Sequence, residues 1–204
     1  MSHPIWSKIN LHKMTPAQSH LGRWSGAAIC ALDNEANFLL LKRSQSVPTH
    51  RGQLAFPGGH RQEGEDPAMT ATREFVEETG IGPQHLQLIG QLAPVPIARG
   101  QVIIPLLART SFLWREMEGQ VLSYREWDVA FSCSLVAMQN QQLWTAAWKS
   151  GPSGDHPFYF RSIGRDEAQV LSGTWPWPSG TFPNPCLLWG ATAQMIQSLL
   201  TIIA

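Results

Sequence analysis

Three glutamates lie close together near the middle of the chain, at Glu74, Glu77 and Glu78. In a helix these positions are related by i, i+3 and i+4, so all three carboxylates project from one face within about one turn. Like charges held this closely repel each other, and a helix that serves only as structure gains nothing from them. A divalent cation removes that cost, and oxygen ligands favour Mg2+, with Mn2+ as an alternative. We therefore predict a metal site here, against the alternative of a solvated acidic helix.

The surrounding sequence carries the signals of a helix that begins near Asp66 and ends near Gly80. Asp66-Pro67 supplies an N-cap followed by a proline, which is tolerated in the first turn. Gly80 stands where a left-handed C-terminal cap is expected. Arg73 lies one turn before Glu77 and can pair with its carboxylate. The face opposite the glutamates is expected to be buried, and it consists of Met69, Thr72, Phe75, Val76 and Thr79.

The spacing of these residues resembles a known sequence motif. Five residues separate Gly59 from Glu65, and seven separate Glu65 from the run Arg73-Glu74-Phe75-Val76-Glu77-Glu78-Thr79-Gly80-Ile81. This pattern is similar to the Nudix box of the pyrophosphohydrolases, with every charged and glycine position matched, although Phe75 occupies a position that is usually aliphatic. The resemblance implies a Nudix fold of the α+β class, an α/β/α sandwich in which a mixed β-sheet lies between helices.

The resemblance also implies how the motif residues work. The metal would be bound by three carboxylates and one main-chain carbonyl, which come from Glu74, Glu77, Glu78 and Gly59. Glu65 is expected to anchor the loop by hydrogen bonding, and Gly80 to end the helix.

Hydrolysis of a diphosphate needs a group that accepts the proton of the attacking water. Glu77 or Glu78 is expected to be this base, and Arg73 would orient the glutamates. Glu126, outside the motif, is the alternative base, because some family members recruit an acid from a later loop. Its other interpretation is a plain surface glutamate. The predicted catalytic residues are therefore Glu77, Glu78, Arg73 and Glu126.

A second resemblance concerns the substrate. The segment Leu40-Leu41-Lys42-Arg43-Ser44, followed by Phe56-Pro57-Gly58-Gly59, is similar to the extra motif of the coenzyme A pyrophosphatase branch of the family. So are GQVIIP at 100–105 and LWGATA at 188–193. The branch resemblance implies cleavage of coenzyme A or an acyl derivative to 3′,5′-ADP and a 4′-phosphopantetheine species. The expected substrate-binding residues are Arg43, His50 and Arg51, together with Arg99 in the loop 94–100, which could instead be a solvated loop arginine.

The chain departs from the branch pattern at three positions. Pro48 stands where an arginine is expected and cannot donate to phosphate, although Arg51 could substitute for it; Leu41 replaces a threonine, and Val129 a second acid. The substrate therefore stays open to ADP-ribose, a nucleotide sugar, a dinucleotide polyphosphate or a nucleoside triphosphate. A different alternative is a non-catalytic domain that binds a nucleotide and reports it, although the intact glutamates argue against this.

The pattern of apolar and turn residues predicts one domain at 25–204 after an N-terminal arm at 1–24. Strands are predicted at 25–32, 37–43, 53–56, 86–91, 102–109 and 124–135, with a short helix at 135–141. The glycine- and proline-rich segments 149–161 and 173–185 are interpreted as loops. In the second, Trp175 and Trp177 could stack on a base or simply pack. The uncharged segment 186–204 is predicted to be an amphipathic helix that packs on the core and does not span a membrane.

The composition of the chain limits which binding partners and which cellular compartment we expect. Lys plus Arg and Asp plus Glu both number 15, so the formal net charge is zero. No overall field attracts the chain to nucleic acid or to an anionic membrane, and the expected partner is a small nucleoside diphosphate compound. A homodimer is compatible with the sequence. Cys30, Cys133 and Cys186 are far apart and fit buried thiols in a reducing compartment, so we expect a cytoplasmic protein.

Overall fold

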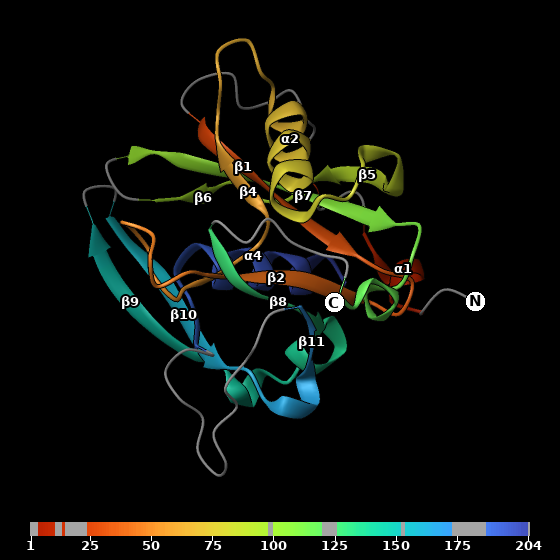
Figure 1. Cartoon of the computed structure of the whole chain (residues 1–204). Coiled ribbons are helices and arrows are strands. Elements are labelled where there is room, and N and C mark those ends of the chain that lie inside the picture. The colour runs from red at the N-terminus through yellow and green to blue at the C-terminus, as the bar shows by residue number, and fades with distance from the viewer. Residues whose placement is uncertain are drawn as a thin grey trace.

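The largest element of the computed structural model is a mixed β-sheet (Figure 1). The structure describes residues 4–10, 14, 24–97, 100–119, 126–151, 154–172 and 187–203. The main strands lie in the order β11, β8, β2, β1, β7, β5, and β1 runs parallel to β7 while the other neighbours are antiparallel. Their bounds are β1 Trp24–Leu32, β2 Asn37–Arg43, β5 Leu86–Gln91, β7 Val102–Thr110, β8 Trp127–Ser134 and β11 Ala168–Ser172.

The sheet splits between its two central strands. Within the described chain, β1 and β2 pair only where Leu32 faces Phe38, next to the turn that joins them. Asp33 fixes this turn, because its carboxylate accepts hydrogen bonds from the N–H groups of Glu35 and Asn37 at 2.8 and 2.9 Å. Farther along, two short strands occupy the opening: β3 (Leu54–Ala55) pairs with β2, and β4 (Gly58–His60) pairs with β1. The chain that precedes the acidic helix is thus held inside the split.

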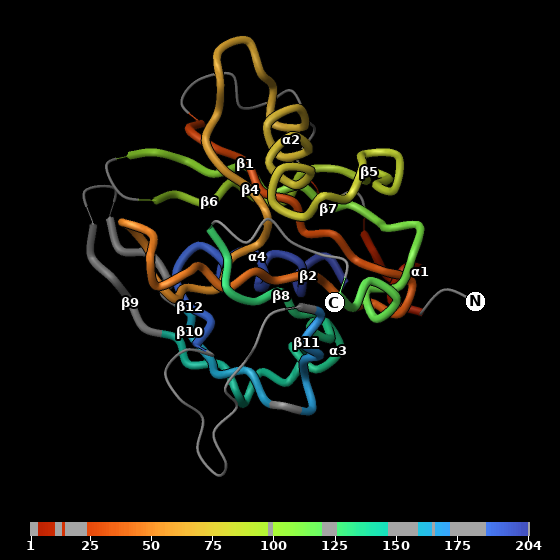
Figure 2. The backbone as a smooth tube through the Cα atoms, in the orientation of Figure 1, coloured from red at the N-terminus to blue at the C-terminus, as the bar shows by residue number. Residues whose placement is uncertain are grey.

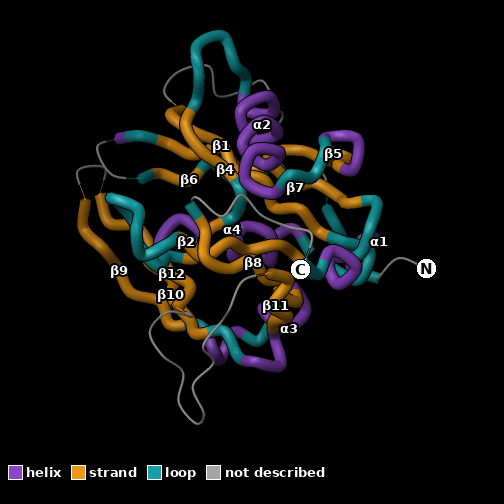
Figure 3. The backbone as a smooth tube through the Cα atoms, viewed as in Figure 1, coloured by secondary structure: helices purple, strands orange, loops and turns teal. Residues whose placement is uncertain are grey.

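Helices cover both faces of the sheet, as Figure 3 shows. Successive residues of a strand point to opposite faces, so β1 contributes to two cores. One core, which contains Cys30, lies under α4 (Gly190–Ile202), and the other, which contains Ile29, lies under α2 (Pro67–Thr79). The predicted α/β/α arrangement with a mixed central sheet is confirmed.

The caps predicted for the acidic helix are present at both ends of α2. The carboxylate of Asp66 accepts a hydrogen bond from the N–H of Met69 at 2.8 Å, with Pro67 in the first turn. Gly80 adopts a left-handed conformation with a φ of 72°, and its N–H donates to the carbonyl of Val76 at 2.8 Å. These local signals fix the length of the helix.

The predicted buried face of α2 is partly wrong. Phe75 and Thr79 are buried, but Met69 is 55% exposed. Thr72 and Val76 are only half-buried. The packed positions follow the spacing i, i+4, i+7 and i+8 of a single helical stripe, and they are Ala71, Phe75, Glu78 and Thr79, with Thr70 beside them. This stripe includes one of the three glutamates, so the carboxylates do not share one environment.

Residues 149–161, interpreted as a loop, form most of a β-hairpin instead. β9 (Thr145–Gly151) pairs antiparallel with β10 (Gly154–Ser162), and β12 (Leu187–Trp189) completes a second, three-stranded sheet. Gly151 and Gly154 pair with each other at the ends of the two strands. Among the described strands, β12 pairs with β10 at 160–162 only, so Pro157 lies where β10 has a single described neighbour, and a proline is tolerated there.

The C-terminal helix is confirmed, although it begins at Gly190, and Leu188 belongs to β12. Its buried residues are Thr192, Ala193, Met195, Ile196, Leu199, Leu200 and Ile202. The N-terminal segment lies beside its end, where the N–H of Asn10 donates to the carbonyl of Ile202 at 2.8 Å. Figure 2 traces this path of the backbone. Within the described residues, no helix is both long and apolar enough to cross a bilayer.

The remaining elements are short. The strand predicted at 124–135 begins at Trp127, and Tyr124 lies outside the described residues, as do Trp175, Trp177 and Cys186. The short helices are α1 (Ile5–Lys8) and α3 (Leu135–Met138), and β6 (Val95–Pro96) pairs with β7. Single 3-10 turns occur at Pro83–His85, Trp114–Met117, Gln141–Leu143 and Arg165–Glu167.

Phe75 is the residue through which α2 packs on the sheet. It is fully buried, and its ring centroid lies 6.5 Å from that of the buried Trp114. Replacing Phe75 with Ala should therefore lower the free energy of unfolding by about 3–5 kcal/mol. Urea unfolding of Met69→Ala provides the matched control, because that side chain is exposed and its loss should change stability by less than about 0.5 kcal/mol. Equal effects of the two changes would contradict this packing.

Candidate active site

The glycines that precede α2 let the helix lie close to the sheet. Gly58 and Gly59 pair with Ala28 and Ala27 of β1. A Cβ atom at position 59 would collide with the carboxylate of Glu74, and one at position 58 would collide with β1. The absence of side chains at these two positions therefore allows a glutamate of α2 to pack directly on the backbone of β4.

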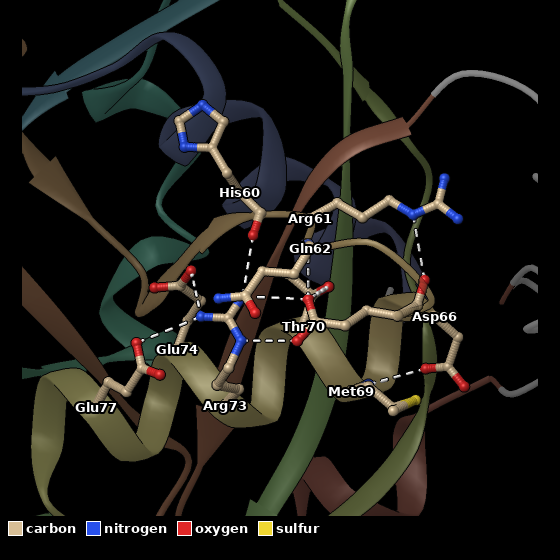
Figure 4. Close-up of polar contacts among 10 residues, drawn as sticks. His60, Arg61, Gln62, Asp66, Met69, Thr70, Arg73, Glu74 and Glu77 are labelled. Carbon is tan, nitrogen blue, oxygen red and sulfur yellow. Dashed lines mark hydrogen bonds and ion pairs between the residues drawn. The ribbon is translucent and has the colours of Figure 1, made fainter.

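Arg73 joins the acidic residues of the motif, as Figure 4 shows. Its Nε and Nη2 donate to the two carboxylate oxygens of Glu65 at 2.7 and 3.1 Å. Its Nη1 donates to Glu74 at 2.8 Å and to Glu77 at 3.3 Å. Nη2 also donates to the carbonyl of His60 at 3.0 Å. One guanidinium thus links the loop before α2 to the carboxylates on the helix.

Glu65 is the most fully bonded of these carboxylates. Besides Arg73, its Oε2 accepts hydrogen bonds from the Thr70 hydroxyl at 2.6 Å and from the N–H of Gln62 at 2.9 Å. The hydrogen bond with Arg73 is the main cause that lowers the pKa of Glu65 to about 2, and those from Thr70 and Gln62 add to it. These contacts join Glu65 to Gln62 in the loop and to Thr70 and Arg73 on α2, which is compatible with the predicted anchoring role.

Glu78 has the opposite environment. Glu78 is only 8% exposed, and its Oε2 accepts a hydrogen bond from the N–H of Gly58 at 3.0 Å. The pKa of Glu78 is raised to about 8, mainly by burial and in part by the negative charges of Glu74 and Glu126, while the Gly58 N–H and Arg43 act against this shift. A carboxyl group is therefore held among like charges at the floor of the site.

Glu126 is brought to the same place by the pairing of β2 with β8. Its carboxylate lies 3.5 Å from Nη2 of Arg43, and its carbonyl accepts from the N–H of Ser44 at 2.8 Å. The guanidinium of Arg43 stacks on the buried ring of Trp127, 4.9 Å from the ring centroid. Nε of Arg43 and Nε1 of Trp127 are both buried and have no hydrogen-bond partner in the described part of the structure. These are unsatisfied donors beside a group of carboxylates.

The other predicted substrate contacts lie on the loop between β2 and β3 or outside the described residues. His50 is exposed, has a φ of 57°, and its Nδ1 lies 3.2 Å from Oε1 of Gln53. Arg51 is exposed and donates from Nε to the carbonyl of Val47 at 2.7 Å. Arg99 lies outside the described residues. The structure thus places His50 and Arg51 on the loop that follows Arg43.

The donor chemistry of the site fits a hard divalent cation, although the side chains are not arranged around one. Within the described ranges, no three His, Cys, Asp or Glu side chains stand close enough together to hold a metal ion. The reason is visible in the contacts: Arg73 engages Glu74 and Glu77, while Glu78 bonds to Gly58. The ligands available are carboxylate oxygens, which Mg2+ prefers, and a cation would relieve the repulsion around Glu78.

Two contacts near the site could not be predicted from the sequence of the motif alone. Trp127 supports Arg43 from the neighbouring strand, and the Thr192 hydroxyl of α4 donates to the carbonyl of Leu54 in β3 at 2.8 Å. Thr192 belongs to the segment 188–193 that resembles the coenzyme A branch. That resemblance located the residue, but the contact with β3 depends on packing between distant parts of the chain.

The bonds of Glu65 generate a prediction about acid stability. Folding lowers the pKa of Glu65 from about 4.3 to about 2. The ionised carboxylate therefore stabilises the fold at any pH above its unfolded pKa, and this stabilisation is lost as the pH falls through its folded pKa. Glu65→Gln should therefore lower the melting temperature at about pH 7, and the difference from the unsubstituted protein should shrink below about pH 4. Glu63→Gln, at an exposed glutamate of the same loop, is the control. A difference that stayed constant with pH would contradict the ion pair.

Comparison with known proteins identifies the family of this site. The family model described as the NUDIX domain matches residues 22–127. The uncharacterized Nudix hydrolase NudL of Photorhabdus laumondii is 40% identical over 70 residues, which cover 34% of this chain and 37% of that protein. NudL of Pectobacterium atrosepticum is 35% identical over 99 residues, which cover 46% of this chain and 52% of that protein. The chain thus spans about a third to a half of the length of these relatives.

A solved structure of a Caenorhabditis elegans Ap4A hydrolase binary complex is 26% identical and aligns with a TM-score of 0.45, covering 54% of this chain and 80% of that one. The family model covers just over half of the 204 residues and includes β1, the glycine loop and α2 with all of its glutamates. The chain therefore belongs to the Nudix family.

Proposed function

We propose that the protein is a Mg2+-dependent pyrophosphohydrolase and that its substrate is coenzyme A or an acyl derivative. The observation that carries the proposal of a metal-dependent enzyme is the environment of Glu78. Its carboxyl group is buried beside Glu74 and Glu126, and that arrangement is unfavourable without a cation. A carboxylate whose pKa is shifted toward neutrality by burial and like charges is typical of a functional site.

The choice of substrate rests on the residues that resemble the coenzyme A branch. Arg43 lies on the strand next to Glu126, and its buried Nε has no partner among the described residues. The side chain of Arg43 is 24% exposed, so the accessible part of its guanidinium could bind an oxygen of a substrate phosphate. The contact of Thr192 with Leu54 fixes the strand just before the glycine loop. Both features support a role for the branch residues in shaping the phosphate site.

The side chains have distinct tasks in the proposed mechanism. Glu74, Glu77, Glu78 and the carbonyl of Gly59 would bind Mg2+, which when bound neutralises the diphosphate and lowers the pKa of a coordinated water. Arg73 holds Glu74 and Glu77 in place. Oε2 of Glu78 is engaged by Gly58, which leaves Oε1 to accept a proton from the water that attacks phosphorus. The phosphorus–oxygen bond to the bridging oxygen then breaks, and 3′,5′-ADP and 4′-phosphopantetheine leave.

The thiols support a cytoplasmic location. Cys30 and Cys133 are both fully buried. Burial raises the pKa of the Cys30 thiol well above its ordinary value, so it is kept in its unreactive form. These features suit a reducing compartment.

Glu78→Gln tests the catalytic assignment. It should lower kcat by about a hundredfold or more, because a carboxylate that binds metal or accepts a proton is lost. Mg2+ affinity measured by calorimetry should also fall. Glu126→Gln separates the alternative base, since it should lower kcat less and leave Mg2+ affinity unchanged. A protein that binds a nucleotide tightly but never turns it over would establish the non-catalytic alternative.

The same variant has a readout that does not depend on activity. The folded-state pKa of Glu78 lies above its unfolded value, so the folded protein binds this proton more tightly. Stability of the metal-free protein should then fall as the pH rises from about 4 to about 8, and Glu78→Gln should remove part of this fall. Parallel pH profiles for the two proteins would show that Glu78 is not buried as described.

A substrate screen tests the proposed specificity. With Mg2+ present, coenzyme A should give the highest kcat/KM, with 3′,5′-ADP as product, among coenzyme A, ADP-ribose, a dinucleotide polyphosphate and a nucleoside triphosphate. If Arg51 replaces the arginine expected at Pro48, Arg51→Gln should raise KM for coenzyme A selectively, and Pro48→Arg in that variant should restore it. Dominance of another compound would reject coenzyme A while leaving the hydrolase assignment intact.

A further inference from the structure

We propose that the protein has a second anion-binding site, for a phosphate group, at the end of β7 away from the glycine loop. A hollow of about 240 Å³ lies there. Its lining residues are Asn34, Gln84, His85, Leu86, Gln87, Arg109, Thr110 and Ser111. Among the described residues, the lining contains one permanent positive charge and several neutral polar groups, and no aspartate or glutamate.

Arg109 is held in a fixed orientation within this hollow. Its Nε donates to Oδ1 of Asn34 at 2.7 Å, and its guanidinium lies over the ring of Trp6, 4.9 Å from the ring centroid. These two contacts use one nitrogen and one face of the planar group. Within the described residues, its terminal nitrogens have no hydrogen-bond partner, so a preoriented pair of donors remains for a ligand.

The two acidic residues of the β1–β2 turn make their hydrogen bonds and ion pairs with groups other than Arg109. The carboxylate of Asp33 accepts hydrogen bonds from the turn and from the N–H of Trp114 at 3.0 Å. Glu35 is paired with Arg115. Neither Asp33 nor Glu35 is among the described residues that line the hollow, so the guanidinium of Arg109 is the charged group that faces a ligand there, and it favours an anion.

The remaining lining residues favour a tetrahedral anion over a planar carboxylate. The Nδ1 of His85 lies 3.0 Å from the hydroxyl of Ser111 on one side, and the amide of Gln87 lies on the strand paired with Arg109. Donors from separate elements can reach the several oxygens of a phosphate, whereas a carboxylate is saturated by the guanidinium alone. At about 240 Å³ the hollow suits a phosphate with a small attached group and is below the usual size of a drug-sized pocket.

This hollow is separate from the Nudix site. In the parallel pairing of β1 and β7, Arg109 is opposite Leu32, whereas the residue of β1 paired with Gly58 is Ala28. Four residues of strand place the two sites roughly 13 Å apart along β1. The inference therefore does not depend on the proposed catalytic function.

Binding of inorganic phosphate to the metal-free protein, followed by 15N–1H NMR, tests the proposal. Saturable shifts are expected at the amides of His85, Gln87 and Ser111, with weaker binding of acetate. Arg109→Gln should weaken phosphate binding at these amides by about tenfold or more, because a charge-assisted hydrogen bond is lost. Arg43→Gln is the matched control near the Nudix site, and it should leave these three shifts in place.

A second variant guards against a folding defect in Arg109→Gln, which also loses the contact with Trp6. Ser111→Glu adds a negative charge at an exposed position of the rim and retains Asn34 and Trp6, the two residues that Arg109 contacts. It should abolish the shifts while the melting temperature stays unchanged. The proposal is overturned if phosphate shifts only the amides around Gly58 and Gly59, or if both variants bind phosphate normally. Equal binding of acetate would overturn the assignment to phosphate.

Discussion

The contact between Arg73 and Glu65 is the one on which the arrangement of the site depends. A guanidinium can donate two parallel hydrogen bonds to one carboxylate, and Arg73 does so while its remaining nitrogen reaches Glu74 and Glu77. Glu65 comes from the loop and the other partners from the helix. The same interaction therefore closes the loop, orients the helix and partly neutralises three negative charges. Removal of either partner would disturb all three together.

The remaining glutamate is held by packing and by a main-chain donor. Glu78 lies on the packed stripe of α2 with Phe75, and within the described residues no hydrogen bond or ion pair joins it to Arg73. Neighbouring residues of one helical turn therefore have very different environments: Glu77 is exposed and ion-paired, whereas Glu78 is buried and favours its neutral form. A cation that binds here competes with the proton on Glu78, so metal affinity should be coupled to pH.

Local signals in the sequence predicted where most helices and strands lie. They could not predict contacts between residues that are far apart in the chain. Caps at Asp66 and Gly80 depend on neighbours within a few residues, so the bounds of α2 could be predicted. The burial of Glu78 in place of Met69 depends on how the helix is rotated against the sheet, which its own sequence does not specify. The hairpin of β9 and β10 was missed because Pro157 and the glycines are read as breakers, whereas pairing along most of the strand outweighs them.

The split between β1 and β2 explains why residues so far apart in sequence meet at one site. Because the two strands separate after Leu32 and Phe38, the glycine loop can pair with β1 on one side while β3 pairs with β2 on the other. The pairing of β2 with β8 then brings Arg43 opposite Trp127, next to Glu126. Sheet pairing, and not the motif, therefore places Glu126 near Arg43 and Glu78. A sequence pattern confined to one loop and one helix could suggest Glu126 only by resemblance, and the pairing supplies the physical reason for its position.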